Sequence, residues 1–143
     1  MEEAILQAPA NFKLYNDRSI YVGTFLGGPL VAGYFAGENF KKLGQGKRVG
    51  VTWLIAVIVT VVVFGSLFLI PGIKKVPHYL IPLVYTLIAQ LVISKYQGNA
   101  IKDHVEAGGN VYPVWRAVGI GVLGGIVTLA IVVAIVLSAG VDV

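Results

Sequence analysis

Few side chains in this sequence have the type and spacing that chemistry would need. The sequence holds no cysteine, which excludes disulfides, iron–sulfur clusters, thiolate zinc sites and cysteine nucleophiles. Asp103, His104 and Glu106 are close in sequence, but they would diverge around a short helix, which is typical of a solvated polar face. Ser66 has no membrane-embedded histidine partner that could activate it as a nucleophile. We therefore predict that the protein is not an enzyme and has no catalytic residue, cofactor or metal site.

Two polar side chains, Thr86 and Gln90, lie one helical turn apart in an otherwise apolar run. In a membrane, a buried amide more often bonds to a neighbouring helix, at roughly 0.6–2 kcal/mol. The alternative is a weakly polar path for a small solute along these two residues. The long apolar runs hold no Asp, Glu, Lys or Arg, and ion-coupled transporters usually need an ionisable group at membrane depth. The sequence therefore disfavours a proton-coupled exporter.

Small residues recur every four positions in the first and last apolar runs. Such spacing lets helix backbones approach closely where lipid removes the hydrophobic drive for packing. The contact could lie within one bundle or between copies in a homo-oligomer. We predict that the stripe of the last run packs against the first run. The candidate helix-packing residues are Gly23, Gly27, Gly33, Gly37, Ala117, Gly121 and Gly125.

The elements that carry these residues follow from composition. The chain has 143 residues, 57% hydrophobic and only 13% charged, about half the usual charged share of a soluble domain. At 1.5 Å per residue, each apolar run comes close to spanning about 30 Å of hydrocarbon, where an isolated strand would leave its backbone unpaired. We predict an all-α integral membrane protein without a sheet, a bundle of four transmembrane helices. The spans are predicted at about 19–37, 50–70, 78–94 and 117–139.

The first span is the weakest, because it is rich in glycine and has Pro29 in its middle. We favour a kinked span, and the alternative is a re-entrant hairpin that turns at Gly27-Gly28-Pro29. Residues 1–18 are predicted to be a polar tail without a signal peptide, since their charges are mixed. A second tail is predicted at residues 140–143.

Lysine and arginine counts predict the orientation. With four spans, seven basic residues flank the first and third loops and four flank the other side. The positive-inside rule then places those loops in the cytoplasm and both termini outside. The net charge of +4 therefore indicates contact with the lipid bilayer and not with nucleic acid. The residues expected to contact anionic lipid are Lys41, Lys42, Lys47 and Arg48.

Four phrases in the chain resemble those of a family of small, hypothetical bacterial membrane proteins with four predicted spans. They are TFLGGPL at 24–30, NFKKLG at 39–44, KYQG at 95–98 and WRAVGIG at 115–121. The resemblance covers about residues 14–137 and implies a multi-pass protein of the bacterial inner membrane. It implies no activity.

Three functional hypotheses follow from the sequence. The first is a non-enzymatic membrane component, a scaffold or accessory subunit that packs through its glycine-rich helix faces, as a homo-oligomer or in a larger membrane complex. The second is an oligomeric passive channel or facilitator for a small solute. A lipid-modifying enzyme with its chemistry in the loop 95–116 has the least support.

Overall fold

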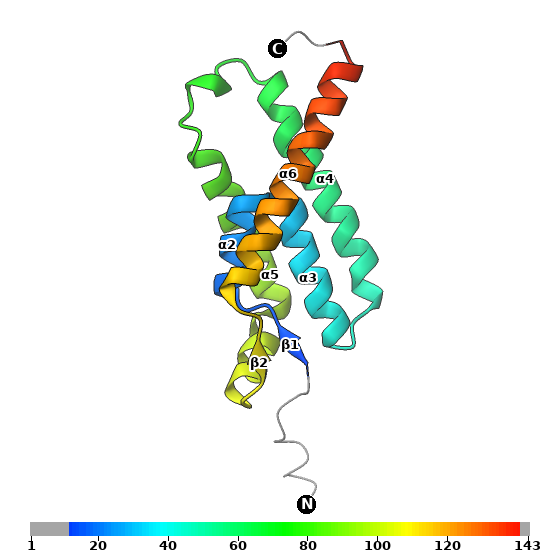
Figure 1. The fold of residues 1–143 in the computed structure, drawn as a ribbon, viewed down its shortest axis with the longest axis vertical. Helices are drawn as coiled ribbons and strands as arrows, with labels where there is room; N and C mark the ends of the chain where they lie inside the picture. Colours follow the sequence, from blue (N-terminus) through cyan, green and yellow to red (C-terminus); the bar gives the residue numbers. More distant parts are fainter. Residues whose placement is uncertain (1–11, 141–143) are drawn as a thin grey trace, which may run out of the picture.

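The computed structural model describes residues 12–140, and this part of the chain is mainly helical (Figure 1). Three helices, α4, α5 and α6, are long and apolar enough to cross a membrane. The prediction of a helical, multi-pass membrane protein is therefore confirmed, but with three such helices among the described residues in place of the four predicted spans. The elements are β1 (Lys13–Leu14), α2 (Asp17–Gly27), α3 (Pro29–Lys42), α4 (Lys47–Leu69), a 3-10 turn η1 (Ile73–Lys75), α5 (Leu80–Glu106), β2 (Asn110–Val111) and α6 (Val114–Ser138).

The segment predicted as the first span is instead a helical hairpin. α2 ends at Gly27 and α3 begins at Pro29, with Gly28 between them at φ 89°. This positive φ is one that glycine adopts without steric cost. Asn39, near the end of α3, exchanges two hydrogen bonds with the backbone of Tyr15, just before α2. The two helices therefore run in opposite directions, and the interpretation of residues 19–37 as one kinked span is wrong.

The hairpin is the centre around which the long helices assemble. α6 packs along α2, α4 packs along α3, and α5 contacts both. The long helices have few close contacts with one another, and they separate beyond the tip of the hairpin (Figure 1). The hydrophobic core accordingly lies at the hairpin, where Ile20, Val31 and Phe35 are buried.

Helix α5 is longer than its apolar run predicts. The run ends at Ser94, but the helix continues to Glu106, so Asp103, His104 and Glu106 do not lie on a separate short helix but on α5. Pro82 lies in its first turn, where a missing N–H is tolerated. The continuation is stable because Gln97, Ile101 and His104 are buried against the rest of the protein.

The polar segment before α2 is part of the fold, although it was predicted to be a tail. Residues 1–11 lie outside the described residues, as do 141–143 of the predicted C-terminal tail. In β1, Lys13 pairs with Asn110 and Leu14 with Val111 in parallel register. This short pairing contradicts the expectation of no sheet. It also buries Leu14 and Tyr15, so the folded region begins before residue 19.

Candidate functional site

The backbones of α2 and α6 approach each other closely along the line of their glycines. A Cβ at Gly121 would lie 2.8 Å from the carbonyl oxygen of Gly23, and a Cβ at Gly27 would lie 2.7 Å from that of Gly121. A Cβ at Gly125 would lie 2.9 Å from the carbonyl oxygen of Leu26. These separations are too short for any side chain, so only glycine allows the two backbones to approach in this way. The last apolar run thus packs against the first, the contact that its spacing predicts.

The remaining glycines of the hairpin contact α4. A Cβ at Gly33 would collide with the side chain of Ala56, and a Cβ at Gly37 would lie 3.5 Å from Nε1 of Trp53. Ala117, which begins the series of small residues in α6, is fully buried. All seven candidate helix-packing residues therefore lie at contacts within one chain.

A buried polar cluster closes the base of the hairpin. The side chain of Asn39 accepts a hydrogen bond from the Tyr15 N–H (2.8 Å) and donates one to the Tyr15 carbonyl oxygen (2.9 Å). The Asn39 amide also donates to Oε1 of Gln97 (3.3 Å), and the Gln97 amide donates to the carbonyl oxygen of Ala36 (2.7 Å). Asn39 and Gln97 are each 1% exposed. The cluster ties α3 and α5 to the chain before α2.

Tyr15 also reaches α6. Nε of Arg116 donates to the Tyr15 hydroxyl (3.0 Å), and the guanidinium lies 4.6 Å from the centre of the Tyr112 ring. Burial raises the pKa of Tyr15 above its ordinary value, and the hydrogen bond from Arg116 partly opposes this. The polar atoms of this cluster bond to other groups of the protein, so the contacts serve to position the helices.

Sequence reasoning missed this cluster, because Asn39 and Gln97 were assigned to polar loops and Tyr15 to a tail. One signal was present for Gln97. It lies four residues after Ile93 and four before Ile101, so a continuous helix places it on the same buried face as those apolar residues. Nothing local marked Asn39, whose partners are 24 and 58 residues away.

The predicted polar path is not continuous in the structure. Thr86 is fully buried, and its hydroxyl has no hydrogen-bond partner among the described residues. The Gln90 amide donates a long bond of 3.4 Å to Ser94, one turn further along α5. The neighbouring Tyr85 donates to the carbonyl oxygen of Phe25 (3.2 Å) and so satisfies a backbone group at the hairpin tip. Thr86 and Gln90 are therefore not joined to each other by a hydrogen bond.

Lys47 and Arg48, two of the four basic residues that were expected to contact anionic lipid, line a groove. This groove, of about 510 Å³, lies between α4 and α5 with α3 as its floor, and Lys47 and Arg48 stand at its end near the base. Lys41 instead forms an exposed ion pair with Glu38 (3.0 Å). Lys42 is exposed at the end of α3.

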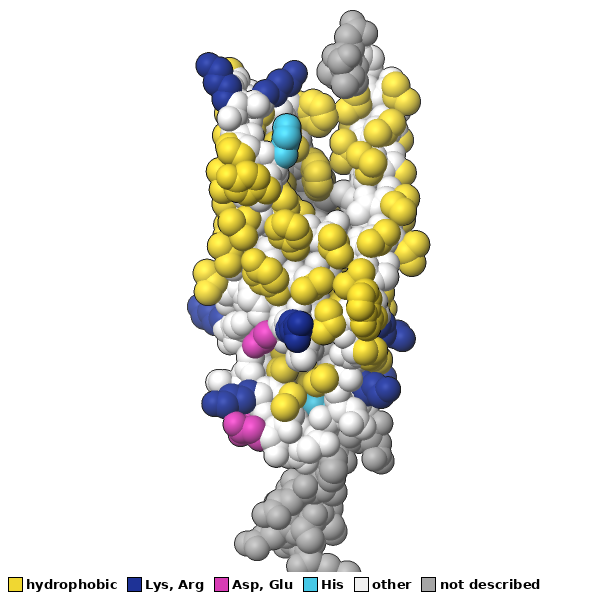
Figure 2. All heavy atoms as spheres, turned by 60° about the vertical axis from the view of Figure 1, so that its left-hand side comes forward, with side chains coloured by type: hydrophobic (Ala, Val, Ile, Leu, Met, Phe, Trp, Pro, Cys, Tyr) yellow, Lys and Arg dark blue, Asp and Glu magenta, His cyan; other side chains and the backbone are white. Residues whose placement is uncertain are grey.

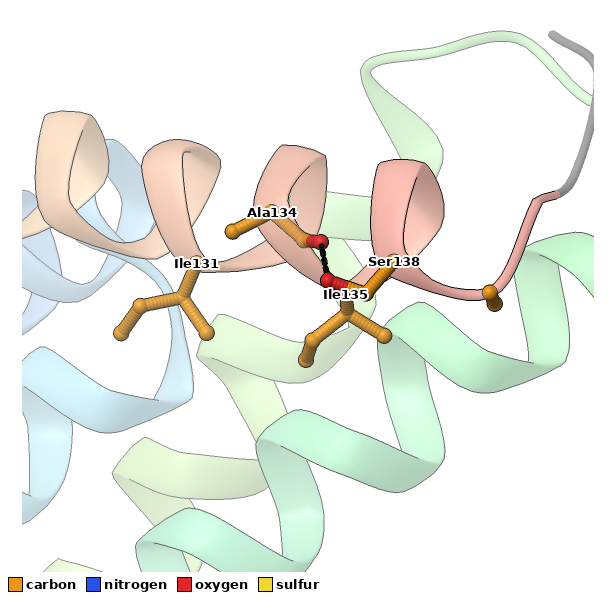
Figure 3. A pocket seen from close by; sticks show the side chains of 5 residues that line it. Ile131, Ala134, Ile135 and Ser138 are labelled. Carbon is orange, nitrogen blue, oxygen red and sulfur yellow. Dashed lines mark hydrogen bonds between the residues drawn. The ribbon is translucent and has the colours of Figure 1, made fainter.

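A second, shallower depression lies on α6. It is lined by Ile131, Ala134, Ile135, Ser138 and Ala139. In Figure 3, the side chains of Ile131 and Ile135 point away from the helix axis on one side. The Ser138 hydroxyl donates to the carbonyl oxygen of Ala134 (2.7 Å), so this surface presents little free hydrogen-bonding capacity.

Among residues 12–140, no group of three or more His, Asp or Glu residues is placed to hold a metal ion. Within this range, His104 has a structural environment. Its Nε2 lies 2.7 Å from the carbonyl oxygen of Asn110, and its ring stacks on Phe12 at 5.0 Å between centroids. His104 thus helps to hold β1 and β2 against α5.

No protein-family model, curated protein or solved structure matches the chain.

Proposed function

We propose that the protein is a non-enzymatic membrane component, a scaffold or accessory subunit that binds another membrane-spanning helix through α4. The observation that carries this proposal is the attachment of α4 by one side only. Of its 23 residues, Ala56 alone is buried. Of the three long helices, α4 has the smallest buried share in its apolar window, 6% against 17% for α5 and 11% for α6.

The surface assigned to the partner is the side of α4 opposite its contact with Gly33. Leu54, Ile58 and Val61 lie there and are 60%, 52% and 63% exposed. At 100° per residue, all three lie more than a quarter turn from Ala56. They form an apolar ridge that suits a neighbouring helix in lipid, where packing is driven by van der Waals contact.

The test is to purify the protein from native membranes in mild detergent and to measure the mass of the particle that contains it. We expect a complex of defined stoichiometry that Ile58→Trp dissociates, while Leu123→Trp, at an exposed apolar site on α6 (66%, against 52% for Ile58), leaves it intact. The mass distinguishes a second copy from a different protein. A monomer in wild-type preparations, or equal effects of the two substitutions, would remove the support for α4 as the docking helix.

We further propose that the base of the hairpin lies in the cytoplasm. The hairpin supports this orientation because it returns the chain to the side from which it came. Nine of the eleven basic residues then lie at the base and only Lys74 and Lys75 at the other end. Figure 2 shows the hydrophobic band between these two ends. The earlier division of seven against four assumed four spans, and the revised division favours the start of α2 inside and the end of α6 outside.

The orientation is testable because the chain contains no cysteine. In intact cells, Lys74→Cys should react with a membrane-impermeant maleimide, whereas Gln45→Cys should react only after the membrane is opened. The reverse pattern would invert the proposed topology. The bacterial inner membrane is our proposed location, and it rests on the sequence resemblance alone.

The passive channel is a second candidate with one observation in its favour. The hydroxyls of Thr24, Thr86 and Thr128 and Oε1 of Gln90 are buried without a partner among the described residues, and such groups usually bind protein or water. Flux of a small neutral solute into proteoliposomes, abolished by Gln90→Leu, would support this candidate. Wild-type vesicles no leakier than empty ones would exclude it for the solute tested.

A further inference from the structure

The groove between α4 and α5 has the dimensions of a site for a linear apolar chain. Its floor is made of small residues of α3, Ala32, Gly33 and Ala36. From Arg48 to Val63 it follows α4 for about 22 Å at 1.5 Å per residue, which is most of the roughly 30 Å of hydrocarbon in a bilayer. Its volume of about 510 Å³ lies within the usual range of small-molecule sites.

Three uncharged polar side chains along this groove are already hydrogen-bonded. The Thr52 hydroxyl donates to the Arg48 carbonyl oxygen (2.7 Å), and the Gln97 amide donates to that of Ala36 (2.7 Å). The Tyr85 hydroxyl donates to the backbone at the hairpin tip. A bound molecule would therefore contact mainly apolar side chains and polar groups that are already hydrogen-bonded, which favours a hydrocarbon chain over a polar solute.

The end of the groove near the base has a different character. Lys47 and Arg48 both line it, and the lining within the described residues includes no carboxylate. The Arg48 guanidinium lies 5.7 Å from the centre of the Phe40 ring, a cation–π contact that holds it close to α3. Glu38, the nearest acidic residue in sequence, pairs with Lys41 instead. Two positive charges are thus available to a ligand at this end.

We propose that the groove binds one anionic phospholipid from the leaflet at the base of the hairpin. One acyl chain lies along α3 between α4 and α5, and the phosphate contacts Lys47 and Arg48. This assignment requires only that the protein is embedded in a bilayer. It holds whether or not α4 binds a partner helix, because the groove residues Thr52 and Val59 lie about 100° or more around α4 from each residue of the Leu54–Ile58–Val61 ridge.

Lipid binding can be measured by native mass spectrometry of delipidated protein in detergent, titrated with phosphatidylglycerol or with phosphatidylcholine of the same chains. We expect one phosphatidylglycerol to bind more tightly than phosphatidylcholine. The double variant Lys47→Gln/Arg48→Gln should weaken phosphatidylglycerol binding by roughly tenfold or more, the order expected for two interfacial cations, and should leave phosphatidylcholine binding unchanged. The matched control is Lys74→Gln/Lys75→Gln, a basic pair at the opposite end, which should bind as wild type.

The part of the groove that would hold the acyl chain is tested separately, by substitutions on α4. Val59→Trp fills the groove and should weaken binding of both lipids, whereas Val61→Trp, on the other side of the same helix, should not. Soluble glycerol phosphate should fail to compete with phosphatidylglycerol. Equal wild-type affinities for the two lipids, unchanged binding in Val59→Trp, effective competition by glycerol phosphate, or a second copy crosslinked through Val59→Cys would each overturn the proposal. The charge variants change only exposed side chains, so misfolding of Val59→Trp would still leave a decisive comparison.

Discussion

Replacing Gly121 with alanine should destabilise the protein, although the change adds only one methyl group. The new Cβ would lie 2.8 Å from the carbonyl oxygen of Gly23 and 3.1 Å from its Cα. Both neighbours are backbone atoms, which cannot rotate away as a side chain could. The strain can be relieved only if α2 and α6 move apart by a few tenths of an ångström.

The expected cost follows from that separation. A radial gap of about 0.5 Å forfeits roughly a quarter of the dispersion attraction between the atoms concerned, and the contact runs along α2 from Gly23 to Gly27. Overpacking of this kind typically costs about 1–3 kcal/mol. Gly119 provides a matched control in the same helix, since a Cβ there would meet nothing within 4 Å. Gly119→Ala should instead stabilise the helix by up to about 1 kcal/mol.

The assay is reversible unfolding in mixed detergent, followed by circular dichroism, with wild type and both variants measured side by side. The two alanine variants should differ by about 1–4 kcal/mol, with Gly121→Ala the less stable. If the two variants have the same free energy of unfolding, the contact between α2 and α6 does not depend on glycine, and the argument from close backbone approach is wrong.

Three further predictions concern the buried polar groups. Asn39→Leu should destabilise the protein by about 2–4 kcal/mol, because it leaves the buried N–H and carbonyl of Tyr15 without partners, whereas the same change at the exposed Asn99 should have little effect in the same unfolding assay. Burial raises the pKa of Tyr15 above 10.0, so the contribution of the neutral hydroxyl to stability is complete below about pH 10 and is lost as pH rises through the raised pKa. The stability of Tyr15→Phe should therefore fall less at alkaline pH than that of the wild type. Identical stability–pH profiles of the two proteins would contradict this. Thr86→Val should leave thermal stability unchanged or raise it by up to about 1 kcal/mol, because it removes a buried unpaired hydroxyl without changing the shape of the side chain; a marked loss of stability would show that this hydroxyl is bonded.

The sequence predicted the long helices well, because their signal is local. A run such as 50–70 is apolar, uncharged and long enough to cross hydrocarbon, and a helix is the one way for such a segment to pair its own backbone groups there. The four-residue spacing of Gly121 and Gly125 likewise indicated a face for close packing, and the structure places α2 against that face. Both inferences needed only composition and helical periodicity.

The path of residues 19–37 was decided by tertiary contacts. A kinked span and a hairpin have the same length, composition and glycine content, so local sequence favours neither strongly. What distinguishes them is whether the end of α3 lies beside the start of α2, and that depends on Asn39 bonding to Tyr15 and Gln97. These partners are far apart along the chain and carry no shared local pattern. The same contacts determine which ends of the helices share a side, and therefore where the basic residues gather. Composition alone determined that the chain is a helical membrane protein, whereas the direction of the hairpin arose from long-range hydrogen bonds that no local pattern encodes.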